Sequence, residues 1–407
     1  MTKTVALLDL DGVLIKSGGY RAVFHASMNY FLRIMGLDSD VGPKEQDLVI
    51  FETYGVTAEW DMLPICLAVV FEHIYTLYNE KITLFSLEQA LSWVASHKAV
   101  DFIVDYEAAL YKMAPYFWET PMPAESIRLA CQNGLGKQLF PQLYCHPLLD
   151  QLLSNTRSSA DSLTTRILMN FQLGDFVFEQ SFHMPAEVKT KSILQANDKT
   201  LLSEDNLQEI QNLFNQERVC FAYLTLRPSY PPKELELKMP GYSPEAELAL
   251  NKIDLHGVPL IAYGRMQFLA SQLGVTPDSL VKPFPYQALA GIKAAIERNE
   301  LQALLWAGKI YKRMQSSVGD TKFDISEFTE SGLSDDLDIH IFEDMPVGIK
   351  STRRAVDLLK GFGYNVKFTA WGITSDKKME IILRGQGARV FSDINQAMKG
   401  FFKLIMD

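Results

Sequence analysis

The chain has 407 residues, 47% of them hydrophobic and 22% charged, which is typical of a globular protein large enough for two or three domains. Its formal net charge of −10 argues against nucleic acid or an anionic membrane as a partner, although a small phosphate ester can still bind where a site carries its own cations. Two early aspartates interrupt the first apolar stretch, unlike in a signal peptide, and the four cysteines lack metal-ligand spacing. We therefore expect a cytoplasmic protein with reduced thiols, and the sequence does not indicate its oligomeric state.

The first predicted strand, residues 4–8, ends in two carboxylates. Its sequence TVALL shows no polar alternation, which is typical of a parallel strand buried on both faces. Asp9 and Asp11 follow it, and Gly12 marks a turn. Open α/β sheets bind ligands at the carboxyl ends of their strands, so we expect this pair to belong to a functional site.

A long helical segment comes next. Apolar residues recur at helical spacing over residues 20–35, and further helices are expected as far as residue 131. Residues 59–61 are expected in a break between two helices, residues 176–182 (FVFEQSF) as a strand, and residues 204–214 as a helix capped by Ser203. The chain therefore leaves its first strand for a mostly helical segment before it returns to the sheet.

The second half of the chain alternates strands with helices, which predicts an α/β fold. Apolar runs at 219–224 and 338–342 end in Thr225 and in the adjacent carboxylates Glu343 and Asp344. Further strands are expected at 258–263, 364–369 and 388–391. Between them, Lys282 precedes a proline that keeps it out of a helix.

These polar residues predict one site. Right-handed connections place the carboxyl ends of parallel strands along one edge of the sheet, so Asp9, Asp11, Glu343 and Asp344 are expected to meet there. Two such charges repel by about 4 kcal/mol at about 4 Å and an effective dielectric near 20, so a bound cation is needed to keep them ionised together. Carboxylates without His or Cys select Mg²⁺ or Ca²⁺, and few ligands plus a substrate phosphate favour Mg²⁺.

The same groups suit phosphoryl transfer. Asp9 can attack phosphorus and form an aspartyl-phosphate, while Asp11 protonates the leaving oxygen and later deprotonates the attacking water. The hydroxyl of Thr225 can donate to a phosphoryl oxygen, and Lys282 offsets the repulsion between carboxylate and phosphate.

These four stretches resemble the four motifs of the haloacid dehalogenase superfamily. They are DLDGV from Asp9, Thr225 with Leu-Arg-Pro after it, Lys282 with its proline, and FEDMPVGI from Phe342. They are most similar to the branch of phosphoglycolate phosphatases and β-phosphoglucomutases, over residues 1–17 and about 216–400. The resemblance implies a Rossmann-like three-layer core on a parallel sheet and Mg²⁺-dependent phosphohydrolase activity.

The resemblance also implies roles for single residues. Asp9 would be nucleophile and metal ligand, and Asp11 the acid–base group and a metal ligand through its backbone carbonyl. Dehalogenases and phosphonatases of the superfamily lack the second aspartate, so its presence points to phosphate esters. Phosphoryl binding falls to Thr225 and Lys282, and metal binding to Asp344 with Glu343.

The inserted segment is the main departure from the family pattern. This branch inserts a helical cap after the first strand, so residues 18–215 are expected to form the cap, and residues 1–17 with 216–407 the catalytic core. The insertion is unusually long, and additional insertions are expected around 230–265 and 299–337. The second of these is acidic and fits a solvated loop better than another metal site; its aspartates are Asp320, Asp324, Asp335, Asp336 and Asp338.

Substrate choice in such enzymes usually resides in the cap. The expected substrate contacts are Tyr20, Arg21, Trp60, Asp61 and Arg227. The leading hypothesis is an Mg²⁺-dependent phosphatase acting on a small phosphorylated metabolite. A phosphomutase that returns the phosphoryl group to a sugar, and a non-catalytic binding protein with the same fold, remain as alternatives.

Overall fold

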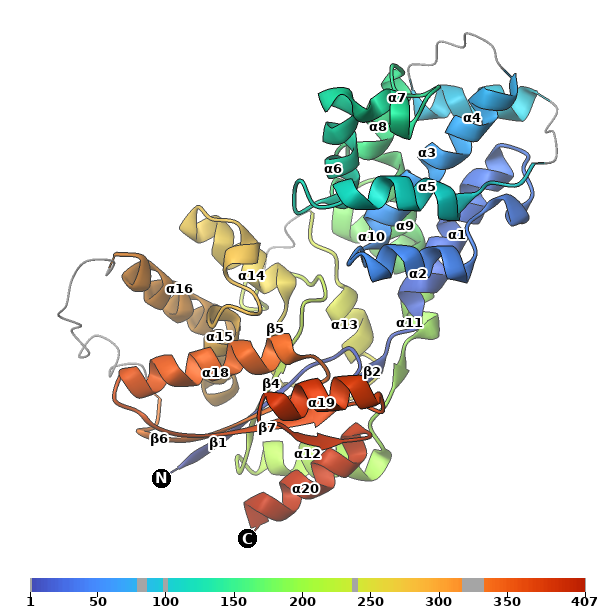
Figure 1. Ribbon diagram of the computed structural model, residues 1–407. Coiled ribbons are helices and arrows are strands. Elements are labelled where there is room, and N and C mark those ends of the chain that lie inside the picture. Colours follow the sequence, from blue (N-terminus) through green and yellow to red (C-terminus); the bar gives the residue numbers. More distant parts are fainter. Residues whose placement is uncertain (1, 79–85, 98–101, 236–240, 317–332, 407) are drawn as a thin grey trace. The chain divides into compact units, whose positions relative to one another are not determined.

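The computed structural model describes residues 2–78, 86–97, 102–235, 241–316 and 333–406. The chain divides into two compact units, which are described separately (Figure 1). We call Met1–Gly18 together with Asn197–Asp407 the sheet unit, and Gly19–Ala196 the helical unit.

The sheet unit is built on six parallel strands in the order β5-β4-β1-β6-β7-β8 (Figure 1). The α/β class expected from the sequence is confirmed. Alternate residues of the central strand face opposite cores, because Val5 and Leu7 join one apolar cluster while Ala6 and Leu8 join the other. The strands are β1 (Lys3–Leu8), β4 (Cys220–Leu224), β5 (Leu260–Ile261), β6 (Asp336–Glu343), β7 (Asn365–Ile373) and β8 (Arg389–Phe391).

Helices cover both faces of this sheet. The cluster with Val5 takes apolar residues from α14, α15, α16, α18 and α19, and the cluster with Ala6 takes them from α12, α13 and α20. A separate antiparallel pair, β2 (Ile15–Lys16) with β3 (Lys199–Thr200), joins the two segments that connect the units. The helices are α12 (Glu204–Asn215), α13 (Glu245–Leu250), α14 (Tyr263–Leu273), α15 (Tyr286–Glu297), α16 (Glu300–Ser316), α18 (Pro346–Gly361), α19 (Lys377–Gly385) and α20 (Ile394–Met406), with a 3₁₀ turn at Pro277–Ser279.

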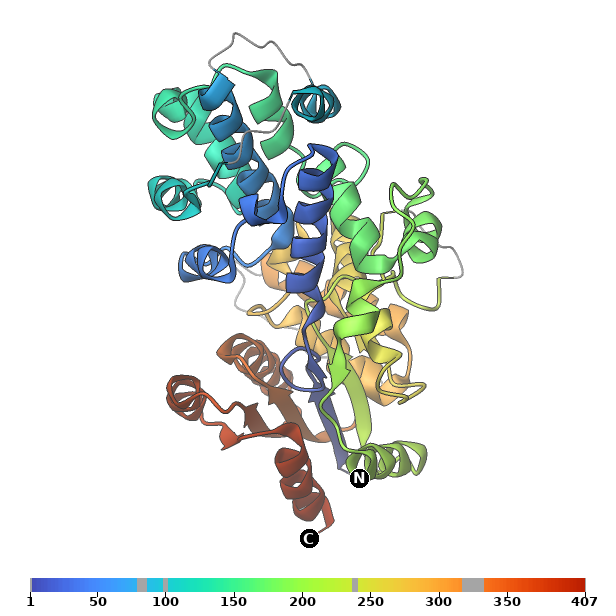
Figure 2. The same ribbon diagram turned by 90° about the vertical axis from the view of Figure 1, so that its right-hand side faces the viewer.

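The helical unit packs around α3 (Glu59–Tyr78), which contacts α1, α6, α8 and α9 (Figures 1 and 2). Length and hydropathy alone would allow α3 to cross a membrane, but 72% of its most apolar window is buried inside the protein, as in the core helix of a globular unit. The other helices are α1 (Gly19–Ile34), α2 (Glu45–Thr53), α4 (Leu87–Ser96), α5 (Tyr106–Met113), α6 (Pro123–Ala130), α7 (Gly136–Leu139), α8 (Pro147–Leu153), α9 (Leu163–Leu173), α10 (Asp175–Phe182) and α11 (Ile193–Asn197), with short turns at Ser39–Val41, Ala114–Tyr116 and Cys131–Leu135.

Two local expectations are wrong. Residues 176–182 lie in helix α10 instead of a strand, because Gly174 at φ 80° ends α9 and a new helix follows it. In that helix the ring centroids of Phe178 and Phe182 lie 5.1 Å apart. The stretch 59–61 is the first turn of α3 instead of a break between helices. The helix was expected to begin at Pro64, because proline favours the first turn of a helix, but Pro64 lies in the second turn of α3.

The second boundary between the units also differs from the expected one. Residues 197–215 belong to the sheet unit, whereas from the sequence they were expected in the insertion. Ile210 and Leu213 of α12 are buried in the sheet unit's core, and the side-chain amide of Asn206 donates to the side-chain oxygen of Asn395 at 3.0 Å. Of the acidic stretch 299–337, Asp320 and Asp324 lie outside the described residues, while Asp336 opens β6.

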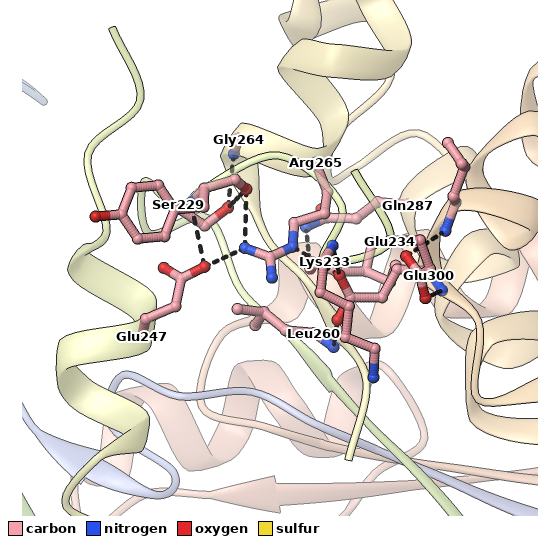
Figure 3. Close-up of polar contacts among 12 residues, drawn as sticks. Ser229, Lys233, Glu234, Glu247, Leu260, Gly264, Arg265, Gln287 and Glu300 are labelled. Carbon is pink, nitrogen blue, oxygen red and sulfur yellow. Dashed lines mark hydrogen bonds and ion pairs between the residues drawn. The ribbon is translucent and has the colours of Figure 1, made fainter. Parts of the chain in front are cut away.

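A buried charged network fastens the edge strand β5 (Figure 3). Arg265 on α14 contacts the carboxylate of Glu247 and donates through Nε to Glu300 Oε2 at 3.1 Å. Glu300 in turn accepts the backbone N–H groups of Leu260 at 2.9 Å and of Lys233 at 3.1 Å. One buried guanidinium therefore holds together the loop after β4, strand β5 and the start of α16.

We predict that Arg265→Leu destabilises the protein severely. The change leaves the buried carboxylate of Glu300 and the partly buried carboxylate of Glu247 without their cation, and breaking a buried ion pair in this way costs about 3–5 kcal/mol. Urea unfolding measures the loss. The control is Arg384→Leu, which removes an exposed helical ion pair to Glu380 and should cost at most about 1 kcal/mol. Equal small losses in both variants would contradict the structural role of the network.

Candidate functional site

The strand ends expected to carry the site lie side by side. Leu8 of the central strand pairs with Tyr223 of β4 and with Phe342 of β6, so the residues that follow these positions lie at the same edge of the sheet. Asp9 comes directly after β1, and its backbone N–H donates to the carbonyl of Phe342 at 3.1 Å. Glu343 is the last residue of β6. The sheet thus brings together the residues that the sequence placed at this edge.

Lys282 is the cation at the centre of this edge. Its ammonium donates to Glu343 Oε2 at 2.9 Å and to Asp9 Oδ1 at 3.2 Å, and its side chain is 2% exposed. Burial disfavours the charged lysine, but the two carboxylates together raise its pKa above the ordinary value, so it stays protonated. Burial raises the pKa of Asp9, an effect that Lys282 opposes and the charge of Asp11 strengthens.

Asp344 completes a group of carboxylates with Asp9 and Glu343. One oxygen of each lies within 4.8 Å of the other two. Burial raises the pKa of Asp344 to about 7, and the neighbouring charge of Asp9 adds to the rise. Two oxygens on one Mg²⁺ are separated by up to about 4.2 Å, because each bond is about 2.1 Å long. The residues therefore fit a divalent cation with small adjustments, and Mg²⁺ stays a prediction.

Two glycines allow the carboxylates to sit where they do. A Cβ on Gly12, whose φ is +71°, would lie 2.1 Å from Asp344 Oδ2. A Cβ on Gly348, in the first turn of α18, would lie 2.2 Å from Glu343 Oε2. Glu343 is buried beside this helix N-terminus, and its pKa lies well above the ordinary value because of burial and the charge of Asp9. The close packing leaves no space for a methyl group at either position.

The backbones of Thr225 and Lys282 are joined by a residue that was not predicted from the sequence. The side-chain amide of Gln287 donates to the carbonyls of Thr225 at 2.8 Å and Ile261 at 3.1 Å, and its oxygen accepts the N–H of Lys282 at 3.4 Å. Gln287 is fully buried in the first turn of α15. The hydroxyl of Thr225 accepts the backbone N–H of Arg227 at 3.2 Å, which leaves its own proton to donate.

Asp11 lies in a tight loop and contacts a buried arginine. The backbone N–H groups of Leu14 and Ile15 both donate to the carbonyl of Leu10, which closes the loop. Arg227 Nε donates to both carboxylate oxygens of Asp11, at 3.0 and 2.8 Å, and Arg227 Nη2 donates to Oδ1 at 2.6 Å. The side chain of Asp11 remains 38% exposed.

Arg227 does not have the surroundings expected of a substrate contact. Its guanidinium is 1% exposed, and besides Asp11 it donates to Asp198 Oδ2 at 2.6 Å and to Ser17 Oγ at 2.7 Å. All three of its guanidinium nitrogens already bind groups of this chain. Substrate binding by Arg227 stays a prediction. Asp198 and Ser17 follow no motif, and the sequence offered no signal for them.

A cavity of about 410 Å³ opens beside Asp344. Gly12 and Asp344 line it together with the segments that follow β7 and β8, and Leu201, Met345 and Met379 also contribute. Its lining mixes apolar side chains with hydroxyls and carboxylates, and among the residues that line it none is Lys or Arg. They are Gly12, Leu201, Asp344, Met345, Ile373, Thr374, Ser375, Asp376, Met379, Ser392, Asp393 and Ile394.

Comparisons with known proteins establish the fold but no family. No protein-family model matches the chain, and no curated protein matches it. One solved structure, an X-ray structure of a Northeast Structural Genomics Consortium target, is similar to it with a TM-score of 0.58. The two are 14% identical in sequence, and the match covers 100% of each chain. At this identity the likeness supports the α/β architecture alone.

The remaining predicted substrate residues lie in the helical unit. Asp61 is fully buried and accepts from the backbone of Ala124 and from Arg157. Its surroundings are those of a structural residue. Trp60 lies under the guanidinium of Arg157, at 4.7 Å from the ring centroid.

Tyr20 and Arg21 lie in the first turn of α1. Arg21 forms ion pairs with Glu52 and Glu45 of α2, and it is partly exposed. These contacts explain how α1 is fixed to α2. Substrate binding by Tyr20, Arg21 and Trp60 stays a prediction.

We predict that Gly348→Ala destabilises the protein although alanine is the better helix former. Alanine in a helix interior is favoured over glycine by about 1 kcal/mol, but here its methyl group must displace the buried carboxylate of Glu343, and such overpacking costs about 1–3 kcal/mol. Gly361→Ala, at the end of the same helix, is the control because nothing lies within 4 Å of its Cβ position. Thermal unfolding of both variants should show a loss for the first and no loss for the second. A gain at both positions would contradict the described packing of Glu343.

Proposed function

We propose that this chain is a divalent-cation-dependent phosphatase of the haloacid dehalogenase type, which hydrolyses a small phosphate ester through a phosphorylated Asp9. The observation that carries the proposal is the meeting of Asp9, Lys282 and Asp344 at one sheet edge, with the carboxylate oxygens within 4.8 Å and the ammonium on Asp9. Buried carboxylates beside one ammonium form a site that attracts a further cation and, through it, a phosphate.

Asp9, Glu343 and Asp344 would hold the cation, and the proposed ion is Mg²⁺ because these ligands are hard oxygens. When bound, such an ion neutralises charge on the phosphoryl oxygens and lowers the repulsion toward the attacking carboxylate. Lys282 holds one oxygen of Asp9 in place and supplies fixed positive charge. The Thr225 hydroxyl donates to a phosphoryl oxygen.

The reaction has two steps. In the first, the free oxygen of Asp9 attacks phosphorus, the bond from phosphorus to the ester oxygen breaks, and protonated Asp11 gives its proton to that oxygen as the alcohol leaves. In the second, Asp11 takes a proton from water, whose oxygen attacks phosphorus and releases phosphate and the Asp9 carboxylate. Asp11 would act from its own loop, where its side chain is partly exposed.

We propose the helical unit as a cap on this core. It is inserted between Gly18 and Asn197, and the two connecting segments are paired as β2 and β3. A cap that closes over a site excludes water and adds substrate contacts, a common role of lids.

We predict different defects for the two aspartates. Asp9→Asn removes the nucleophile, so turnover of an aryl phosphate with Mg²⁺ should fall by about 10⁴-fold or more. Asp11→Asn keeps the nucleophile and should lose about 10²–10⁴-fold, the usual contribution of acid–base catalysis. An aryl leaving group needs little protonation, so phosphorylated enzyme should accumulate in Asp11→Asn and be detectable as an intact-mass increase.

Two outcomes would contradict this assignment. A phosphate adduct on Asp9→Asn would move the nucleophile elsewhere, and full activity in both variants would remove both residues from the mechanism. Phosphate release, compared with isomerisation of sugar phosphates in the same preparation, separates a phosphatase from a phosphomutase.

The cavity beside Asp344 supports a substrate class. Its carboxylates Asp376 and Asp393 already cap α19 and α20, and their charge repels a second anionic group. Its apolar residues and hydroxyls suit an uncharged or cationic alcohol. We infer that the substrate is a phosphate monoester whose alcohol part carries no carboxylate or second phosphate.

We predict that the charge on the alcohol part of the phosphate ester determines kcat/KM for its hydrolysis. Ethanolamine phosphate and glycerol phosphate should be hydrolysed with at least about tenfold higher kcat/KM than phosphoglycolate, because each close like-charge pair costs about 1 kcal/mol or more even in water. Steady-state phosphate release with each ester measures the ratio. A preference for phosphoglycolate would show that the alcohol part does not enter this cavity.

A further inference from the structure

Arg227 is a buried guanidinium with three partners from separate parts of the chain. Its side chain is 1% exposed, as is that of its partner Asp198. It donates to both oxygens of Asp11, to Asp198 and to the hydroxyl of Ser17. A planar guanidinium that binds a carboxylate through two nitrogens fixes the direction of that carboxylate as well as its distance.

The partners of Arg227 lie on both segments that connect the units. Ser17 follows β2, just before the chain enters the helical unit, and Asp198 precedes β3, just after the chain returns. Arg227 itself follows β4, beside Thr225. One side chain therefore joins the Asp11 loop to the outgoing and the returning segment.

The contacts divide the two oxygens of Asp11 into different roles. Oδ1 accepts from Arg227 Nε, from Arg227 Nη2 and from the hydroxyl of Ser17, so its acceptor capacity is in use. Oδ2 accepts one bond, from Arg227 Nε at 2.8 Å. Oδ2 is therefore the oxygen with capacity to carry a proton toward the substrate.

We propose that Arg227 is a positioning residue, which orients Oδ2 of Asp11 toward the leaving oxygen. Because Arg227 also binds both connecting segments, this orientation depends on where those segments lie. The proposal rests on the proposed phosphatase function, in which Asp11 is the acid–base group. A displacement of either connecting segment changes the direction of Asp11 through the shared guanidinium. Arg227 acts through Asp11 and needs no contact with the substrate.

The leaving-group dependence of the first step tests this role. Each variant is assayed with an aryl phosphate whose leaving group needs little protonation and with an alkyl phosphate whose leaving group needs it fully. The quantity compared is the aryl-to-alkyl ratio of kcat/KM, which does not depend on the fraction of folded enzyme. Asp11→Asn should raise this ratio by about 10²-fold or more, because only the alkyl ester requires the acid.

Arg227→Lys keeps the charge but loses the planar two-nitrogen contact, and we expect it to raise the ratio by about tenfold or more. Arg227→Met combined with Asp198→Asn removes the guanidinium without leaving Asp198 charged and buried, and should raise the ratio further. Asp198→Asn alone should give a smaller rise. Arg218→Lys, an exposed arginine just before β4, is the control and should leave the ratio unchanged.

The outcomes separate the two proposals. A raised ratio in Asp11→Asn together with an unchanged ratio in both Arg227 variants would overturn the positioning role and leave the phosphatase intact. A wild-type chain without turnover, or an Asp11→Asn variant with an unchanged ratio, would overturn the proposed function and this inference with it. Raised ratios in Asp11→Asn and in both Arg227 variants, with none in Arg218→Lys, support the proposal.

Discussion

A buried ammonium between two carboxylates is the interaction on which the candidate site depends. Lys282 contacts Asp9 and Glu343, which come from neighbouring strands, and without this cation two buried negative charges would face each other. At an effective dielectric near 20 that repulsion is about 4 kcal/mol at about 4 Å, before the cost of burying each charge. Neighbouring residues support these ion pairs: Gln287 binds the backbone N–H of Lys282, and Gly348 leaves space for the Glu343 carboxylate.

A second buried cation organises the neighbouring loop. Arg227 holds Asp11, and through Asp198 it also holds the segment by which the chain returns to the sheet. The proposed nucleophile and the proposed acid–base group are thus positioned by different cations, although only Leu10 separates them in sequence. Asp9 is fixed by the sheet and Lys282, whereas Asp11 is fixed by the connecting segments. Under the proposed mechanism, the acid–base group would therefore be positioned by the connecting segments and the nucleophile by the sheet.

The parts of the fold that follow from local pattern were predictable. Uninterrupted apolar runs ending in Asp9, Thr225 and Glu343 indicated parallel strands. Right-handed connections between such strands place their carboxyl ends at the same edge of the sheet. Local pattern failed at residues 176–182, where Gly174, at a positive φ, precedes a helix in a run that was expected to be a strand. Gln287 and Asp198 could not be found, because Gln287 joins Lys282 to Thr225, 62 positions away, and Asp198 binds Arg227, 29 positions away. Arg227 was expected to contact substrate, but its partners Asp11 and Asp198 could not be predicted, since sequence does not show which carboxylate a buried arginine will meet.

The central claim is that Asp9 becomes phosphorylated, and chemical mapping of the phosphorylated residue tests it most directly. The wild-type chain is mixed with an aryl phosphate and Mg²⁺, quenched in acid within the first turnover and treated with borohydride, which reduces an aspartyl-phosphate to homoserine. Peptide mass analysis then locates the reduced residue. We expect homoserine at position 9 and at no other aspartate, and its loss when Mg²⁺ is chelated. A mark on Asp11 or Asp344, or phosphate release without any reduced aspartate, would contradict the account.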